Sequence, residues 1–262
     1  MLRYFSLFLF IVSSLTTHIV YAQKVELYSA NLFPAEPYGG TEELKRLVKQ
    51  CMVYPAWAIE NEIEGEVFID FKIDAEGQIL ESKISGTDHE SLRNEAFRIF
   101  KRIHWIKDEG RSGKVGGYDK IKIEFNLKKY QKLVKNRGYT ELPLAVDSVS
   151  DDMKVYTINQ VEDQPQISNA KNVNAFVAKH FKYPSIAIQR GISGRVIVDF
   201  VIEPYGLVSN IQIIESLPGG CDEEAKRLVK MMEWTPALLE NKAVRCLYRY
   251  ELNFVNPGGV IR

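Results

Sequence analysis

Histidine and cysteine are residue types that often bind metals or take part in catalysis, and this 262-residue chain has four histidines and three cysteines. His18 lies in the first, apolar segment, and His89 and His104 have no neighbour at the spacing of a metal-binding motif. His180 falls on the apolar stripe of an expected helix, where a core or half-buried residue is expected. The sequence contains no CxxC, HExxH, GxSxG or phosphate-loop motif. We therefore expect no enzyme activity, no metal site and no cofactor.

The three cysteines are expected in the protein core. Cys51 lies on a helical stripe, and Cys221 takes the position that Leu92 has in the first copy of an internal repeat described below. Cys246 falls on the apolar side of the last expected strand. A disulfide between Cys221 and Cys246 is one alternative, because helix and sheet should face each other there and an oxidising compartment permits the bond. Free buried thiols are the other alternative.

Composition and charge argue against nucleic acid as a partner. Thirty-four basic residues cancel thirty-four acidic residues, whereas nucleic-acid binding needs a basic surface. A hydrophobic content of 45% and a charged content of 26% are ordinary for a soluble globular protein.

Residues 1–22 are expected to be a cleavable signal peptide. Arg3 precedes the apolar run YFSLFLFIVSSL, and Val20, Tyr21 and Ala22 end the segment in the manner of a cleavage site. The apolar run is shorter than a full membrane span. We therefore expect an exported, soluble chain, with an uncleaved membrane anchor as the alternative.

A long stretch of the sequence occurs twice. YPAWAIENEIEGEVFIDF begins at Tyr54, and YPSIAIQRGISGRVIVDF begins at Tyr183. From these tyrosines to Trp105 and Trp234 the copies align without a gap at an offset of 129 residues. Residues shared by both copies include Pro55/Pro184, Gly65/Gly194, Asp70/Asp199, Gly77/Gly206, Glu95/Glu224 and Arg98/Arg227. The period is too long for a solenoid, so the pattern indicates duplication of a whole domain.

Each copy is expected to contain a helix, two strands, a second helix and a third strand, in this order. Apolar residues at helical spacing mark the helices, and alternation of apolar and polar residues marks the strands. A hairpin joins the first two strands, and the helical connection returns the third strand to the other side of the first. The sequence therefore predicts an α+β fold of two tandem small domains. Each is a three-stranded antiparallel sheet of order 2-1-3 with two helices on one face.

The domain boundaries follow from the repeat. We expect domain 1 over residues 23–130, a polar linker over residues 131–154, and domain 2 over residues 155–262. The alternation in the last strand aligns Ile121, Ile123, Phe125 and Leu127 with Tyr248, Tyr250, Leu252 and Phe254. In this alignment the segment WIKDEGRSGKVGG of the first copy is two residues longer than its counterpart.

The outer edge of each third strand is the feature that could bind something. An unpaired edge presents a row of N–H and C=O groups to an incoming chain. Lys120 and Lys122 lie on the outer face of the first copy's edge strand. They are either guards against unwanted pairing or a rim for a bound peptide.

The repeated residues resemble a known family. YPAWAIENEIEGEVFIDFKIDAEGQI, the PYGG at Pro37–Gly40, and WTPALLENKAV from Trp234 are similar to the C-terminal domain of TonB, the periplasmic part of the bacterial energy transducer. The likeness covers about residues 35–127 and 165–255. It implies that an extended peptide, the TonB box of an outer-membrane receptor, pairs with the sheet edge. The binding residues would be Tyr248, Tyr250, Glu251, Leu252, Asn253 and Phe254 in copy two, and Ile121, Ile123, Glu124, Phe125, Asn126 and Leu127 in copy one.

This resemblance leads us to expect a periplasmic binding protein linked to TonB-dependent transmembrane transport. Its partner would be a TonB-dependent outer-membrane receptor or another envelope protein. Energy transduction needs a permanent inner-membrane anchor, which the expected signal peptide does not supply. If the leader is retained, the chain would be anchored in the inner membrane and face the periplasm. The alternative function is an envelope interaction protein whose repeats pair with each other, or form a homo-oligomer through their edge strands, without binding a receptor.

Overall fold

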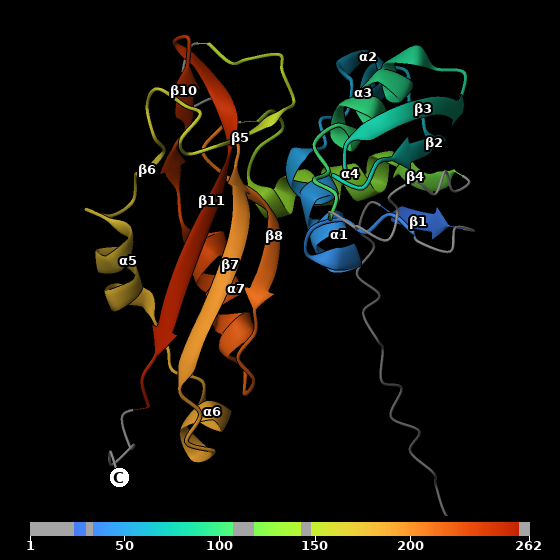
Figure 1. The fold of residues 1–262 in the computed structure, drawn as a ribbon. Helices are drawn as coiled ribbons and strands as arrows, with labels where there is room; N and C mark the ends of the chain where they lie inside the picture. Colours follow the sequence, from blue (N-terminus) through green and yellow to red (C-terminus); the bar gives the residue numbers. More distant parts are fainter. Residues whose placement is uncertain (1–23, 30–33, 107–117, 143–147, 257–262) are drawn as a thin grey trace, which may run out of the picture.

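The computed structural model describes residues 24–29, 34–106, 118–142 and 148–256 (Figure 1). It confirms an α+β fold in two halves with antiparallel sheets. The expected signal peptide and its cleavage site lie outside the described residues. None of the described helices combines the length and the apolar composition needed to cross a lipid bilayer.

The first half is built on a four-stranded antiparallel sheet in the order β1-β4-β2-β3. The buried residues of α1 and α3 share one hydrophobic core with the inward-facing residues of β2 and β4. Its elements are β1 (Val25–Ser29), α1 (Gly40–Cys51), α2 (Ala56–Glu60), β2 (Gly65–Ile73), β3 (Ile79–Gly86), α3 (Glu90–Phe100), β4 (Asp119–Phe125) and α4 (Leu127–Arg137).

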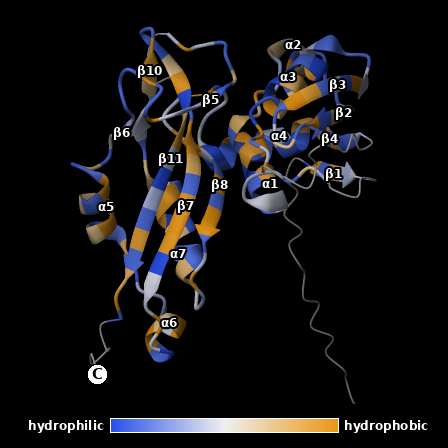
Figure 2. Cartoon of the chain, viewed as in Figure 1, coloured by the Kyte–Doolittle hydropathy of each residue, from blue (hydrophilic) through white to orange (hydrophobic). Residues whose placement is uncertain are grey.

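The second half has a five-stranded sheet in the order β10-β11-β7-β8, with β5 paired in parallel to β11. A separate two-stranded ladder joins β6 and β9. Its elements are β5 (Val155–Thr157), β6 (Gln166–Ile167), α5 (Val173–His180), α6 (Ser185–Gln189), β7 (Gly194–Ile202), β8 (Val208–Glu215), α7 (Cys221–Met231), β9 (Trp234–Thr235), β10 (Ala237–Leu239) and β11 (Lys242–Phe254). Figure 2 shows hydrophobic residues along much of β7, in the middle of this sheet, whereas hydrophilic residues interrupt β11.

The expected three-stranded sheets are too small. The predicted order 2-1-3 is present at the centre of each sheet, as β3-β2-β4 and as β8-β7-β11, but each sheet has further strands. In the first half β1 extends the sheet beyond β4, and in the second half β5 and β10 pair with β11. Strands β1 and β5 are short and lie outside the repeated part of the sequence, so the comparison of the two copies could not reveal them. Strand β10 lies inside the second copy, and its counterpart at residues 108–110 is outside the described residues.

The register of the last strand also differs from the expectation. Gly65 pairs with Phe125, and the equivalent Gly194 pairs with Phe254. Phe125 and Phe254 are therefore equivalent, and the offset of 129 residues continues to the end of the repeat. The sequence alignment pairs Phe125 with Leu252, which is a shift of two residues from the observed register. The two-residue insertion expected ahead of β4 is therefore not present. A slip of two residues keeps every side chain on the same face of a strand, and alternation alone cannot detect it.

The expected linker begins with a helix of the first half. Helix α4 starts at Leu127, where the side chain of Asn126 caps it by accepting a hydrogen bond from Lys129 N at 3.0 Å. Tyr130 is buried in the first core. The Arg137 guanidinium at the other end of α4 donates to Met52 O at 2.7 Å. The first half therefore continues into the segment that was assigned to the linker.

In both halves a shared Glu-Arg pair, on α3 in the first half and on α7 in the second, forms hydrogen bonds with the backbone just ahead of the Tyr-Pro segment. In the first half, Glu95 Oε1 accepts from Val53 N at 2.7 Å, and the paired Arg98 donates to Cys51 O. In the second half, Glu224 Oε1 accepts from Lys182 N at 2.7 Å, and Arg227 donates to His180 O at 2.6 Å. The duplicated pair thus binds the backbone where the preceding helix ends, which explains why these charged residues occur in both copies.

Candidate functional site

The outer edge of β4, one of the two expected peptide-binding edges, is occupied by the chain itself. Strand β1 runs antiparallel along β4, with Val25 opposite Ile123 and Leu27 opposite Ile121. Glu124 N donates to Lys24 O at 3.0 Å, which continues the ladder by one residue. The backbone groups at this edge are therefore already used in the described structure. Of the expected binding residues, Asn126 and Leu127 belong to the cap and first turn of α4 rather than to the strand.

The outer edge of β11 is covered over only part of its length. Residues 148–157 run parallel to β11 and pair with it as far as Leu247, through an isolated bridge at Val149 and through β5. Among the described residues, no segment pairs with the outer edge beyond this point. The stretch from Tyr248 to Phe254, which pairs with β7 on its inner side, contains the residues expected to bind a peptide. We call this stretch the β11 edge.

The hydrogen bonds of Ala243 show which backbone groups of the β11 edge face outward. Ala243 N donates to Ser148 O, and Ala243 O accepts from Ser150 N, both at 2.9 Å. N–H and C=O directions alternate along a strand. The odd-numbered residues Arg249, Glu251 and Asn253 therefore direct both groups away from β7. In the first half, Glu124 is equivalent to Asn253. The N–H of Glu124 donates to Lys24 O, just ahead of β1.

The side chains of the β11 edge alternate between the core and the surface. Leu252 and Phe254 are buried in the second core, and Tyr248 and Tyr250 pack against it. Tyr250 Oη donates to Asn174 Oδ1 on α5 at 3.3 Å. Arg249, Glu251 and Asn253 are exposed on the other face. Between its apolar and its charged face, the edge therefore offers backbone groups that no described strand pairs with.

The opposite edge of the second sheet, strand β8, is covered by the first half. Glu43 on α1 accepts from Ile211 N at 3.2 Å, and Arg46 donates to Val208 O at 2.9 Å. Gly39 N, just before α1, donates to Gln212 Oε1 at 2.6 Å. Side chains of α1 and the backbone of Gly39, rather than a paired strand, thus form hydrogen bonds with β8 at this edge. No β-pairing joins the sheets of the two halves in the described chain.

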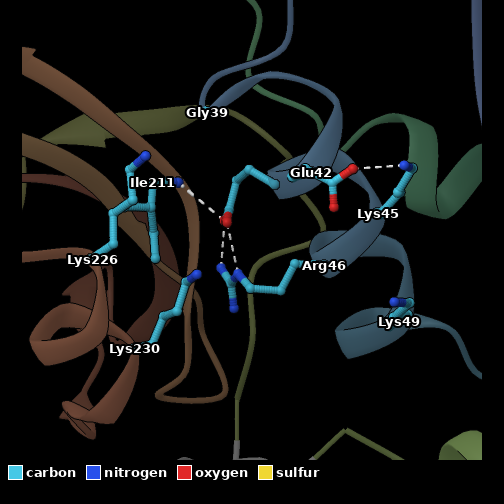
Figure 3. A pocket seen from close by; sticks show the side chains of 9 residues that line it. Gly39, Glu42, Lys45, Arg46, Lys49, Ile211, Lys226 and Lys230 are labelled. Carbon is cyan, nitrogen blue, oxygen red and sulfur yellow. Dashed lines mark hydrogen bonds and ion pairs between the residues drawn. The ribbon is translucent and has the colours of Figure 1, made fainter. Parts of the chain in front are cut away.

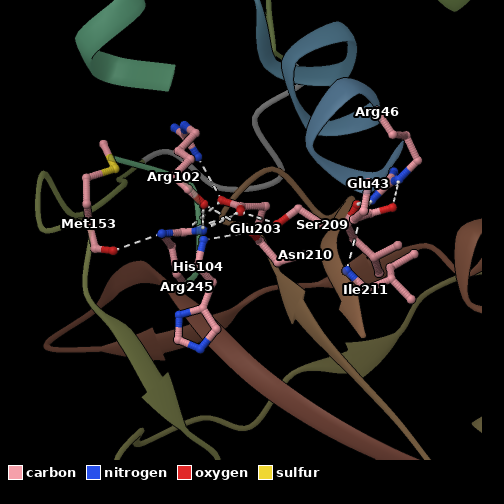
Figure 4. A network of polar contacts seen from close by, with 11 residues as sticks. Glu43, Arg46, Arg102, His104, Met153, Glu203, Ser209, Asn210, Ile211 and Arg245 are labelled. Atoms are coloured by element: carbon pink, nitrogen blue, oxygen red, sulfur yellow. Dashed lines mark hydrogen bonds and ion pairs between the residues drawn. The ribbon is translucent and has the colours of Figure 1, made fainter. Parts of the chain in front are cut away.

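A buried ionic network holds the two halves together (Figure 4). Glu203 is fully buried and contacts Arg102 of the first half at 2.7 Å and Arg245 of β11 at 2.9 Å. Arg245 also donates to Arg102 O at 2.7 Å. Asn210 bridges the same contact, because its Oδ1 accepts from His104 N at 2.8 Å and its Nδ2 donates to Arg102 O at 3.1 Å. The network therefore links one half to the other through both side chains and backbone.

Charge balance keeps this carboxylate ionised. Burial by itself raises the pKa of Glu203, but the positive charges of Arg245 and Arg102 outweigh it, so the pKa lies below its ordinary value of 4.5. Ser209 Oγ donates to Glu203 Oε1 at 2.5 Å, which also favours the ionised form. A buried carboxylate with two guanidinium partners is a structural feature of the junction between the halves rather than a general acid or base.

A pocket of about 330 Å³ lies at the same junction, between α1 and α7 (Figure 3). Its two acidic residues, Glu42 and Glu43, each form an ion pair on α1 itself. Burial lowers the pKa of Lys230; the charge of Glu43 opposes this shift, and the charges of Arg46 and Lys226 add to it. The lining residues are Gly39, Glu42, Glu43, Lys45, Arg46, Lys49, Ile211, Lys226 and Lys230. The excess of cations gives this face a positive potential, which favours acidic groups over basic ones.

The cysteines are free thiols in separate places. Cys51 lies in the first core, Cys221 in the second, and Cys246 in a small cluster with Ala237 and Val244. The disulfide considered between Cys221 and Cys246 is therefore not present, because the two residues lie in different clusters. Within the described ranges, no group of three or more His, Cys, Asp or Glu side chains could hold a metal ion.

We expect the three thiols to be unreactive in the folded protein. Burial raises the pKa of Cys51 and of Cys246 to about 11, and burial also raises the pKa of Cys221. The thiolate is the reactive form, so native protein at pH 8 should show no rapid reaction with a chromogenic disulfide reagent, and unfolded protein should show three reactive thiols. A single reactive thiol after unfolding of unreduced protein would instead indicate a disulfide.

Sequence reasoning missed the covering strand β1 and the Glu203 network. The alternation of Val25 and Leu27 with Glu26 and Tyr28 is a strand signal, but it is only five residues long. Glu203 occupies the hairpin position that Asp74 has in the first copy, where an acidic residue is expected to face water. Its burial depends on Arg102, which has no basic counterpart in the second copy. No local pattern could reveal this contact.

Comparison with known families matches both repeats. The model of the family described as Gram-negative bacterial TonB protein C-terminal matches residues 50–127 and residues 179–255, together more than half of the chain. In the sequence, the first match ends just after β4 and the second just after β11, so each match includes one complete third strand. No curated protein matches the chain.

Proposed function

The chain belongs to the family of TonB protein C-terminal domains, and we propose that it is a periplasmic protein that binds an extended peptide as an added strand on the β11 edge. The proposed peptide is the TonB box of an outer-membrane receptor, which would link the protein to TonB-dependent transmembrane transport. The observation that carries this proposal is the set of outward N–H and C=O groups at Arg249, Glu251 and Asn253, with which no described segment pairs.

The chain's own segments support this mode of binding. Strand β1 adds to β4, and residues 148–157 add to the N-terminal part of β11, so short extended segments pair with both third strands. In strand addition the main-chain hydrogen bonds supply affinity and alternate side chains supply selectivity. The β11 edge would bind an external segment in the same way that the equivalent edge binds β1.

The alternative function, pairing of the repeats with each other, is less well supported. The contact between the halves uses α1, the segment ahead of it and the residues after α3, and it reaches β8 and Arg245 rather than the β11 edge. Self-association of two chains through the β11 edge would use the same backbone groups as a peptide. Measuring the oligomeric state with and without peptide separates the two.

We expect Glu251→Pro to weaken peptide binding at least tenfold and to leave the fold intact. Proline removes the outward N–H of residue 251, and its ring projects toward the position of the added strand. The hydrogen bonds between β11 and β7 do not use this N–H, and proline is tolerated where the N–H of an edge strand faces solvent. Isothermal titration with synthetic TonB-box peptides should show at least a tenfold loss of affinity, equal to about 1.4 kcal/mol.

The matched control is Glu251→Ala, which removes the same side chain and keeps the N–H. It should retain binding within a few-fold of the unchanged protein, and both variants should have native circular dichroism. Tyr250→Pro differs, because the N–H of residue 250 faces β7 and its loss disrupts the sheet itself. Binding by Glu251→Pro equal to that of Glu251→Ala would overturn the proposal.

A further inference from the structure

The strand bound at the first-half edge shows how side chains select a partner there. Glu26 of β1 lies directly opposite Lys122 of β4, and their charged groups are 3.0 Å apart. Lys122 also reaches Glu66 on β2 at 3.1 Å. Glu66 is diagonal to Lys122, because Lys122 pairs with Phe68 and Glu66 pairs with Glu124. Three neighbouring strands thus carry an acidic, a basic and an acidic residue on one face of the sheet, and Lys122 on β4 contacts both acids.

The equivalent positions in the second half have the opposite charges. The register makes Glu251 the equivalent of Lys122 and Arg195 the equivalent of Glu66. Arg195 lies 3.6 Å from Glu251 and 2.9 Å from Glu215 on β8. On this face an acid, a base and an acid therefore follow one another from β8 to β11, with Arg195 diagonal to Glu251. The series ends at the open edge with Glu251, whose side chain is 47% exposed. The next position, which β1 fills with an acid in the first half, has no described occupant here.

Charges near Glu251 leave its carboxylate available to an added strand. Arg249, the nearest basic residue along β11, forms two hydrogen bonds with Asp199 at 2.7 and 2.8 Å. Arg195 makes its shorter contacts with Glu215. Each arginine thus has another carboxylate as its closer partner, and a positive charge opposite Glu251 would extend the alternation of charges to the added strand.

The residues beside Glu26 define the other face of the added strand. Val25, which lies opposite Ile123, is buried, and Leu27, which lies opposite Ile121, packs against the core. In the second half the residues equivalent to Ile123 and Ile121 are Leu252 and Tyr250. Leu252 is buried in the second core and Tyr250 packs against it, so this side of an added strand would again contact apolar surface.

Building on the proposed function, we infer that the β11 edge selects an antiparallel strand of the pattern apolar–basic–apolar. The Lys or Arg lies opposite Glu251, and the two apolar residues lie opposite Leu252 and Tyr250. Glu251 is the residue that determines specificity. The same rule rejects β1 of a second copy of this chain, because its Glu26 would lie opposite Glu251 and like charges directly opposite each other destabilise a strand pair.

A charge-exchange experiment tests this inference. The probes are two fluorescent hexapeptides with blocked ends, KVELYS, which is the sequence of residues 24–29, and KVKLYS, which replaces the acidic residue by lysine. They are titrated against the unchanged protein and against Glu251→Lys, with fluorescence anisotropy as the readout. We expect the unchanged protein to prefer KVKLYS by about 3- to 10-fold at low salt, and Glu251→Lys to prefer KVELYS by a similar factor. Both preferences should shrink in high salt.

The outcomes separate the specificity from the proposed function. Equal binding of the two peptides by both proteins would overturn the charge rule and leave strand addition standing. An unchanged preference in Glu251→Lys would assign the selectivity to another residue and would also overturn the inference. If neither peptide binds either protein at millimolar concentration, the β11 edge does not accept strands, and the proposed function fails with it.

Discussion

Glu203→Gln lowers the free energy of unfolding by about 3–5 kcal/mol, which is the usual result of removing one partner from a buried ion pair. Glutamine has nearly the same shape as glutamate, so the core packing is kept. The guanidinium groups of Arg102 and Arg245, which are 8% and 2% exposed, lose the charge that compensates them. Urea denaturation followed by circular dichroism measures the change.

The internal repeat supplies a matched control for this prediction. Asp74 has the equivalent position in the first half, but it is only partly buried and accepts a hydrogen bond from Gln78 N at 2.7 Å within its own turn. Asp74→Asn should therefore cost about 1 kcal/mol or less. Equal losses for Glu203→Gln and Asp74→Asn would show that the network contributes no more than an ordinary turn contact.

Acidification should reveal the same network. The pKa of Glu203 is lowered in the folded protein relative to the ordinary value of 4.5. A group with a lowered folded-state pKa contributes stability above its unfolded pKa, and this contribution is lost as the pH falls toward the folded pKa. Below pH 4.5 the unchanged protein should therefore lose stability more steeply than Glu203→Gln. Parallel pH profiles of the two proteins would contradict this expectation.

The repeated parts of the fold were accessible from the sequence, because each pattern was present twice. Helix stripes, alternating strands and hairpin glycines agree between the copies, and Gly77 and Gly206 have nearly the same φ of +80° and +79°. Two independent copies of one pattern make a chance assignment improbable. The class, the order of the central strands and the family resemblance all depend on this repeated information.

The sequence does not predict those parts of the fold in which the two halves differ. Strand β1 and residues 148–157 both add to third strands, but they pair in opposite directions and share no pattern, so no internal comparison could reveal them. The junction depends on long-range contacts such as Arg102 with Glu203, 101 positions away in the sequence. The sequence indicates that β11 has a strand edge that can bind a partner, but it does not indicate how much of this edge stays unpaired. That length depends on where residues 148–157 stop pairing with β11.

Gly39→Ala should separate the two halves, and it is the second substitution with a large expected effect. A Cβ atom at Gly39 would lie 2.2 Å from Ile211 O on β8 and 2.5 Å from the Cβ of Glu43. Neither neighbour can move without disturbing the contact between α1 and β8, since Glu43 also accepts from Ile211 N at 3.2 Å. We expect a loss of about 3 kcal/mol, from the backbone clash together with the strain of a side chain at a φ of +74°.

Gly40→Ala is the control that isolates the clash from the strain. Gly40 has a similar φ of +69°, but an added Cβ would meet no atom within 4 Å. Its alanine variant therefore experiences the left-handed strain alone, about 1 kcal/mol. Hydrogen exchange of the Ile211 amide is the local readout, because this N–H is bound to Glu43 across the junction. Exchange should accelerate in Gly39→Ala and stay slow in Gly40→Ala. Equal protection in the two variants would mean that close approach at Gly39 does not hold the halves together.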